Sequence, residues 1–243
     1  MTSSSSPLAF DHLVVMLRDE LEARSAAFEA AGYRLGPPGY HNLGSMNRLI
    51  ALNSTYIELL GWPQGSEPLR KEIADQPLGL DALVFRSHDA HADQARLHHA
   101  GFDVQPVSHL ERPVEISGSS RIARFNTVRF NSQPIDGLRV YFCQHLTPEL
   151  VWNEDLTEHA NGARFIHSIE LSAADAASTA AMLAKLVNGQ VAEESGRYDV
   201  RLENTLISIT TSPDNAGARI NRARLLHADG NLHDFDYTLG AGR

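Results

Sequence analysis

The feature of this sequence that most constrains its fold is an internal repeat with a constant offset of 70 residues. FDHLVVML precedes RDELEARSAAFEAAGY, and LDALVFRS precedes DAHADQARLHHAGF. Each copy joins a Val- and Leu-rich run, typical of a strand, to a helix-forming segment that ends at a glycine, Gly32 or Gly101. Identical residues recur at the offset: Asp11 and Asp81, Leu13 and Leu83, Val14 and Val84. One supersecondary unit is therefore expected at least twice.

Further β-type runs follow each helix. In the first copy a brief strand is expected around 33–36, followed by NRLIAL and TYIELLGW, which are joined as a tight hairpin at Asn53 and Ser54. In the second copy the closing strands are RIARFNTVRFN and LRVYFCQH. The pattern predicts an α+β fold of repeated βαβββ units.

A third copy begins at ARFIHSIEL, continues through DAASTAAMLAKLVNG, and is expected to end in YDVRLE, TLISITTS and INRARLLHAD. We therefore expect a paired domain over 8–150, a linker over 151–163 and a third βαβββ-like unit over 164–243. The third unit either covers the first pair within the chain or pairs with its counterpart in a second subunit. We favour a homodimer.

Charge and composition restrict the partners. A formal net charge of −9 argues against a nucleic-acid surface, which needs clustered Lys and Arg. No apolar run approaches the roughly 20 residues that span a bilayer. The single cysteine, Cys143, and the absence of a secretory signal in MTSSSSPLAF predict a cytoplasmic protein. A small-molecule substrate is expected.

Two short motifs carry a family resemblance. Asp11-His12-Leu13-Val14 opens the first unit and Tyr56-Ile57-Glu58-Leu59 closes it, with Gly44-Ser45 and Asn47 between them. In this order the motifs resemble those of glyoxalase-like domain proteins of the vicinal-oxygen-chelate superfamily, over about residues 8–150. The resemblance implies curved mixed sheets around a cup-shaped cavity, with one inward metal ligand from the first strand of a unit and one from the last. His12 and Glu58 match those places.

The residue types suit such a site. A neutral imidazole and a carboxylate on adjacent strands can bind a divalent ion such as Fe, Zn, Mn or Ni and leave positions open for substrate. Alternation places Glu58 on one strand face with Tyr56 and Leu60. The alternative is that His12 caps a strand start and Glu58 faces solvent.

The second copy departs from this pattern. Ala82 stands opposite His12, and Cys143 or its same-face neighbour His145 is expected opposite Glu58. His145 is therefore the candidate third ligand, and it would complete a two-histidine, one-carboxylate set. Alternatively, His145 is a strand-end histidine that binds the backbone of the following turn.

Other residues are weaker candidates. His41, Ser45 and Asn47 in GYHNLGSMN, together with Tyr56, are expected to contact the substrate at the rim of the cup. His167 takes the place of His12 in the third copy, and His227 lies near the end of that copy, so they form a second possible site. The alternative is that both are structural histidines.

Three functions remain open at this stage. The leading hypothesis is metal-dependent lyase or isomerase chemistry on a small oxygenated compound, with Glu58 as the catalytic residue. The first alternative is an Fe(II) extradiol-type dioxygenase that uses His12, His145 and Glu58. The second is a non-catalytic binding or resistance protein, a hypothesis that the missing ligand at Ala82 supports.

Overall fold

The computed structural model describes residues 6–41, 44–66, 68, 71–116 and 118–242. The first unit comprises β1 (Phe10–Arg18), α1 (Leu21–Ala30), β2 (Gly39–Tyr40), β3 (Met46–Ala51) and β4 (Tyr56–Gly61). The short helix α2 (Lys71–Ala74) leads to the second unit, which comprises β5 (Gly79–Arg86), α3 (Ala90–His99), β6 (Ser108–Ile116), β7 (Ser119–Val128) and β8 (Arg139–His145).

Both units have the predicted βαβββ order, and TYIELL and VYFCQH lie in the strands β4 and β8. The brief second strand differs from the prediction, because it lies at Gly39–Tyr40 and not around 33–36. Pro37 and Pro38 have no backbone N–H to donate, so the ladder with β3 begins only after them.

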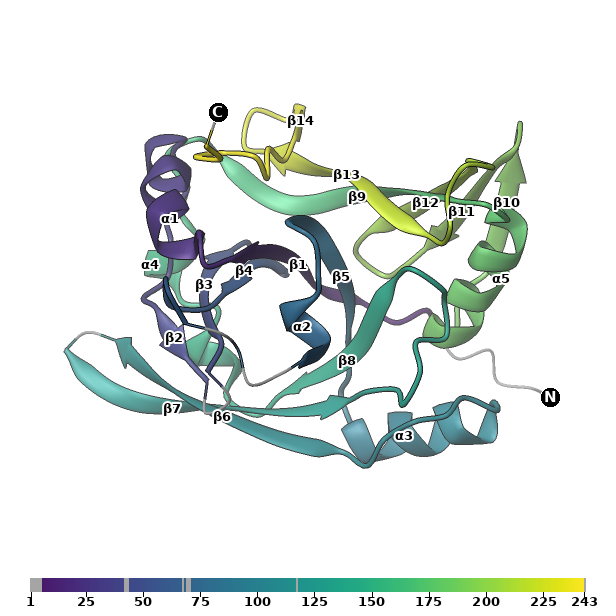
Figure 1. Ribbon diagram of the computed structural model, residues 1–243, viewed down its shortest axis with the longest axis horizontal. Coiled ribbons are helices and arrows are strands. Elements are labelled where there is room, and N and C mark those ends of the chain that lie inside the picture. Colours follow the sequence, from purple (N-terminus) through teal and green to yellow (C-terminus); the bar gives the residue numbers. More distant parts are fainter. Residues whose placement is uncertain (1–5, 42–43, 67, 69–70, 117, 243) are drawn as a thin grey trace.

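The two units form one eight-stranded sheet in the order β2-β3-β4-β1-β5-β8-β7-β6. β1 and β5 pair antiparallel at its centre, with Leu13 opposite Leu83, while each is parallel to the last strand of its own unit. This register relates the units by an approximate twofold axis. The sheet is strongly curved (Figure 1), which confirms the expected fold of repeated units in curved mixed sheets.

After β8 come a 3₁₀-helix, η1 (Pro148–Leu150), and the short helix α4 (Glu154–Thr157). A third βαβββ unit follows: β9 (Ala163–Ala173), α5 (Ala176–Val187), β10 (Val191–Glu194), β11 (Arg197–Arg201) and β12 (Leu206–Thr211). β13 (Arg219–His227) and β14 (Leu232–Asp234) complete a six-stranded sheet in the order β10-β11-β12-β9-β13-β14.

The segment INRARLLHAD, expected to close the third unit, instead contributes to β13. The closing strand of each unit is parallel to the first strand, and that place beside β9 belongs to β12. β13 pairs antiparallel with β9, as β5 does with β1. β13 is therefore the first strand of an incomplete fourth copy.

One continuous core joins the two sheets. On β1, Leu13 and Val15 are fully buried in a cluster that also contains Phe28 of α1, Leu97 of α3 and Ile169 of β9. The six-stranded sheet, which lies above β1 in Figure 1, thus covers the outer face of the larger sheet within the same chain. The alternate residues of β1 face the concave side.

Candidate active site

A cavity of about 320 Å³ lies in the concave face of the eight-stranded sheet. Five of the sequence-predicted residues line it: His12, His41, Asn47, Tyr56 and Glu58. Its walls also carry apolar side chains and three arginines. Ile73 of α2 is fully buried in an apolar cluster with Val14, Met16 and Trp62, and this cluster also contains the lining residue Leu60.

A β-bulge in β1 brings the side chains of two consecutive residues, Asp11 and His12, into contact. Phe10 pairs with Phe85 and His12 pairs with Val84, so the register shifts by one residue at Asp11. A bulge relaxes the strict alternation of a strand. Here the Asp11 carboxylate Oδ2 lies 2.8 Å from His12 Nδ1 although the residues are adjacent in sequence.

The bulge orients His12 for ligation. A histidine whose Nδ1–H donates to a carboxylate presents an unprotonated Nε2, the arrangement that accompanies most metal-bound histidines. His12 Nε2 lies 3.6 Å from Glu58 Oε2, and its ring stacks on that of Tyr56 with centroids 4.2 Å apart. Two donor atoms at this separation can both lie about 2.0–2.2 Å from one ion. The donor set therefore fits a divalent metal.

Glu58 is held in its charged form. Its burial opposes ionisation, but the electrostatic effects of the His12 and His41 rings and the hydrogen bond from Asn47 outweigh burial, and the pKa of Glu58 is lowered from its usual value. Asn47 Nδ2 donates to Glu58 Oε1 at 2.6 Å. Glu58 Oε2 is the oxygen that faces His12.

His145 is turned away from this pair. Its Nε2 lies 2.8 Å from Asp11 Oδ2, and Arg86 Nε donates to Asp11 Oδ1 at 2.8 Å. Burial would raise the pKa of Asp11, but the charges of and hydrogen bonds from His145 and His12 lower it well below its usual range. The structure therefore brings His12 and Glu58 together, whereas His145 contacts the carboxylate of Asp11. Its bond is to a carboxylate, and not to the backbone of the following turn.

Asp11, Cys143 and His145 also place potential ligand atoms within 4.8 Å of one another. Burial raises the pKa of the Cys143 thiol well above its usual value. The Asp11 carboxylate already accepts hydrogen bonds from three side chains. This cluster is best described as a hydrogen-bonded support for His12.

The register corrects which residue of the second unit corresponds to Glu58. Val14 pairs with Glu58, and the matching Val84 pairs with Tyr141, so Tyr141 takes the place expected for Cys143 or His145. The Tyr141 hydroxyl lies 3.1 Å from His12 Nε2, and burial raises the pKa of Tyr141 above its usual value. At neutral pH this hydroxyl is protonated and can donate a hydrogen bond in the cavity.

Comparison with known proteins identifies the family. The sequence profile described as "Glyoxalase-like domain" matches residues 10–187. The chain belongs to this glyoxalase-like family. No curated protein matches the chain.

Several solved structures share the fold. A hypothetical protein from Staphylococcus aureus has a TM-score of 0.71 at 17% identity, over 94% of this chain and 99% of that one. A xylose isomerase-like TIM barrel/4-hydroxyphenylpyruvate dioxygenase fusion protein has a TM-score of 0.57 at 14% identity, over 91% of this chain and 37% of that one. A mutant 4-hydroxymandelate synthase from Streptomyces coelicolor gives 0.51 at 12% identity, over 88% and 65%. These structures show a shared fold, and the profile match over residues 10–187 confirms the predicted resemblance to glyoxalase-like domain proteins.

The rim of the glyoxalase-like cup contains the remaining predicted contacts. His41 lines the cavity, and its Nδ1 lies 2.8 Å from Ser45 Oγ. Ser45 itself is 1% exposed and supports the ring of His41. Residues 42–43 of the connecting loop lie outside the described part of the chain. Among the described residues of this segment, His41 and Asn47 line the cavity.

The second possible site does not assemble. The β9–β13 register has its bulge at His167, so Ser168 takes the place of His12 and His167 that of Asp11. His167 is exposed, while His227 Nδ1 donates a hydrogen bond to the carbonyl oxygen of Asn161, 2.8 Å away. His227 pairs with Ala163, several residues from His167 along β9.

Sequence reasoning missed the three arginines of the cup, Arg112, Arg129 and Arg139. A signal existed for one of them: in SHLERPVEI, Arg112 alternates with Leu110 and Val114, so it shares the strand face of apolar residues.

The described residues contain no helix with the length and apolar character needed to cross a bilayer.

Proposed function

We propose that this glyoxalase-like protein is an enzyme that binds a divalent metal ion through His12 and Glu58 and acts on a small oxygenated compound by lyase or isomerase chemistry. The observation that carries the proposal is the 3.6 Å separation of His12 Nε2 and Glu58 Oε2 in the cavity. When bound, the ion would polarise adjacent substrate oxygens and favour an enolate-like anion.

The surrounding side chains prepare these two ligands. Asp11 retains the proton on Nδ1 of His12, and Asn47 holds Glu58 through Oε1, so that Nε2 and Oε2 remain for the ion. Glu58 is the residue on which both ion binding and catalysis depend. Tyr141 supplies a neutral hydroxyl that can donate to a substrate oxygen or its developing charge.

The two alternatives receive different support. A dioxygenase with His12, His145 and Glu58 as ligands would require His145 to leave Asp11, so the geometry favours it less. A non-catalytic binding protein is the second candidate, and the observation in its favour is that Ala82 and Tyr141 replace the ligand-bearing positions of the second unit.

The test is metal binding by Glu58→Gln. This substitution removes the negative charge that holds the ion. We expect binding of Zn, Mn, Fe or Ni to weaken by at least about tenfold to a hundredfold, because changes to residues that only support a ligand already cause a loss of this size. Elemental analysis and calorimetric titration with the metal alone measure the change, and circular dichroism checks the fold.

The matched control is Glu111→Gln, which removes the same charge from an exposed carboxylate that also lines the cup. It should bind metal like the parent protein. If Glu58→Gln does so too, the metalloenzyme hypothesis is wrong and the binding-protein alternative moves ahead.

Two further expectations belong to this proposal. The protein is a homodimer, and it works in the reducing cytoplasm, where the buried, unpaired Cys143 stays a thiol. The six-stranded sheet buries its apolar face within the chain, so a dimer would form through other surfaces.

A further inference from the structure

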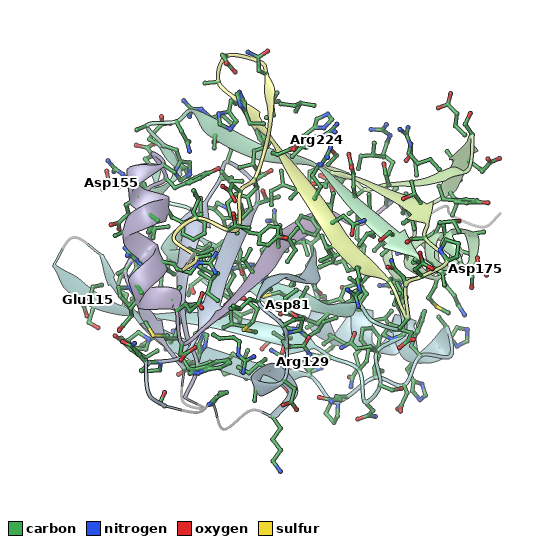
Figure 2. The ribbon with its side chains drawn as sticks, turned by 45° about the horizontal axis from the view of Figure 1, so that its top comes forward. Asp81, Glu115, Arg129, Asp155, Asp175 and Arg224 are labelled. Atoms are coloured by element: carbon green, nitrogen blue, oxygen red, sulfur yellow. The ribbon has the colours of Figure 1, made fainter. Side chains whose placement is uncertain are left out.

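Three arginines line the cup of a protein whose net charge is −9. Two of its three arginines are engaged. Arg139 forms an ion pair with Asp81, and the guanidinium of Arg129 lies 4.8 Å from the centre of the Tyr141 ring. Figure 2 labels Asp81 of β5 and Arg129, which directly follows β7, and both lie away from Arg224 on β13.

Arg112 on β6 is different. Its side chain lines the cavity and is only 6% exposed, yet it makes no hydrogen bond or ion pair with any residue that the structure describes. A buried guanidinium stays charged near neutral pH, and its burial is unfavourable unless a partner compensates. Burial lowers the pKa of Arg112, while the charges of Tyr56 and Glu58 act in the opposite direction. An anionic ligand would supply the missing partner.

The position of Arg112 relates it to the His12–Glu58 pair. A Cβ atom at Gly39 would lie 2.5 Å from Asn47 Oδ1 and 2.7 Å from Arg112 Nη1, so the glycine leaves room for both groups side by side. Asn47 in turn donates to Glu58. Asn47 Oδ1 is itself buried without a hydrogen-bond partner among the described residues. A ligand bound to Arg112 therefore lies beside Asn47, the residue that contacts Glu58.

We propose that Arg112 binds the carboxylate of the substrate, and that the substrate is a small monocarboxylic acid. The guanidinium fork matches one carboxylate through two parallel hydrogen bonds. Because the other two arginines are already engaged, the cup offers one such place, which suits a single carboxylate better than a multiply charged phosphate. Leu49, Leu60 and Phe125 line the same cavity and would contact the carbon skeleton. This inference rests on the proposed function, since both use the same cup.

The experiment compares acids with neutral amides of the same shape. Benzoate and phenylacetate are titrated calorimetrically against benzamide and phenylacetamide, with the full chain in metal-loaded and chelator-treated forms. We expect each acid to bind about tenfold to a hundredfold more tightly than its amide, the range of hydrogen bonds to charged groups. The preference should persist after chelation, because Arg112 and not the ion holds the carboxylate.

Arg112→Met should abolish this preference. The matched control is Arg124→Met, which removes an exposed arginine paired with Glu111 and should leave the preference unchanged. Because Arg112 has no partner to lose, we also expect the melting temperature of Arg112→Met to equal or exceed that of the parent, whereas a structural arginine would lower it. Arg112→Gln replaces Arg112→Met if the latter does not fold.

The outcomes separate this inference from the proposed function. Equal binding of acid and amide, a preference that survives removal of Arg112, or no detectable binding of any probe overturns the inference. If the preference for acids disappears on chelation, the carboxylate binds the ion and not Arg112. This result also overturns the inference. If no metal binds but the acid preference depends on Arg112, only the metal proposal fails.

Discussion

At the scale of single residues, Asp11 organises the site without facing the substrate. It is fully buried, and its carboxylate accepts from Arg86, His12 and His145. Three donors around one buried carboxylate stabilise its charged form strongly. The bulge at Asp11 is therefore both a structural element and the means by which His12 is oriented.

Replacing this carboxylate should cost stability. We expect Asp11→Asn to lower the free energy of unfolding by about 3–5 kcal/mol at pH 7, as when one partner of a buried charge pair is removed. Urea denaturation measures the change. Glu111→Gln, at an exposed pair, should cost less than about 1 kcal/mol.

The loss of stability in Asp11→Asn depends on pH. The pKa of Asp11 is lower in the folded than in the unfolded chain, so the unfolded chain binds the extra proton and stability falls as the pH drops below about 4. The Asp11 contribution is complete above that pH. The difference between parent and Asp11→Asn should therefore shrink progressively below pH 4, and a constant difference would contradict this account.

At the scale of elements, the segment after β8 packs against one end of the large sheet, where β4 begins and β8 ends. Trp152, just after η1, contacts His145 with ring centroids 4.7 Å apart and Tyr56 with centroids 5.7 Å apart. The Arg86 guanidinium lies 4.7 Å from the centre of its ring, and its Nε1 donates to Thr55 O at 3.1 Å. This aromatic side chain joins the linker to both units.

Trp152→Ala should loosen that end. We expect a loss of about 2–3 kcal/mol in the free energy of unfolding, less than the 3–5 kcal/mol typical of a fully buried aromatic because Trp152 is half-buried. Chemical denaturation measures it, with Phe165→Ala, an exposed aromatic on β9, as the control. Equal effects of the two substitutions would show that the linker does not hold the cup.

At the scale of the whole molecule, the two sheets depend on each other. The core that contains Leu13 and Val15 of β1 continues into Ile169 of β9 and Leu225 of β13. The exposed face of the smaller sheet is polar: Arg224 and Arg222 lie close to Glu170 and Asp234. The third unit therefore acts as a cover for the outer face of the cup.

Removing the cover should prevent folding. A chain ending at residue 163 keeps the whole eight-stranded sheet but exposes the apolar residues that the smaller sheet covers. We expect this fragment to be insoluble or to lack a cooperative thermal transition, as monitored by circular dichroism beside the full chain. A fragment that melts cooperatively near the temperature of the full chain would contradict this view.

The sequence by itself determined the repeated βαβββ units, because strand and helix periodicities are local and the offset between Asp11 and Asp81 makes them visible twice. It also singled out His12 and Glu58, through short motifs at strand ends. Only the tertiary structure decided that Tyr141 corresponds to Glu58, because loops of different length and register shifts set which residues face each other across a sheet.

The tertiary structure also decided the roles of His145 and Arg112. A one-residue bulge at Asp11 directs His145 to a carboxylate, and no strand pattern reports such a bulge. Arg112 lies 54 residues from Glu58 in sequence, and only the curvature of the sheet brings both to one cavity. Local sequence thus specified the elements, whereas burial and charge pairing within the cup depend on contacts between strands far apart in the chain.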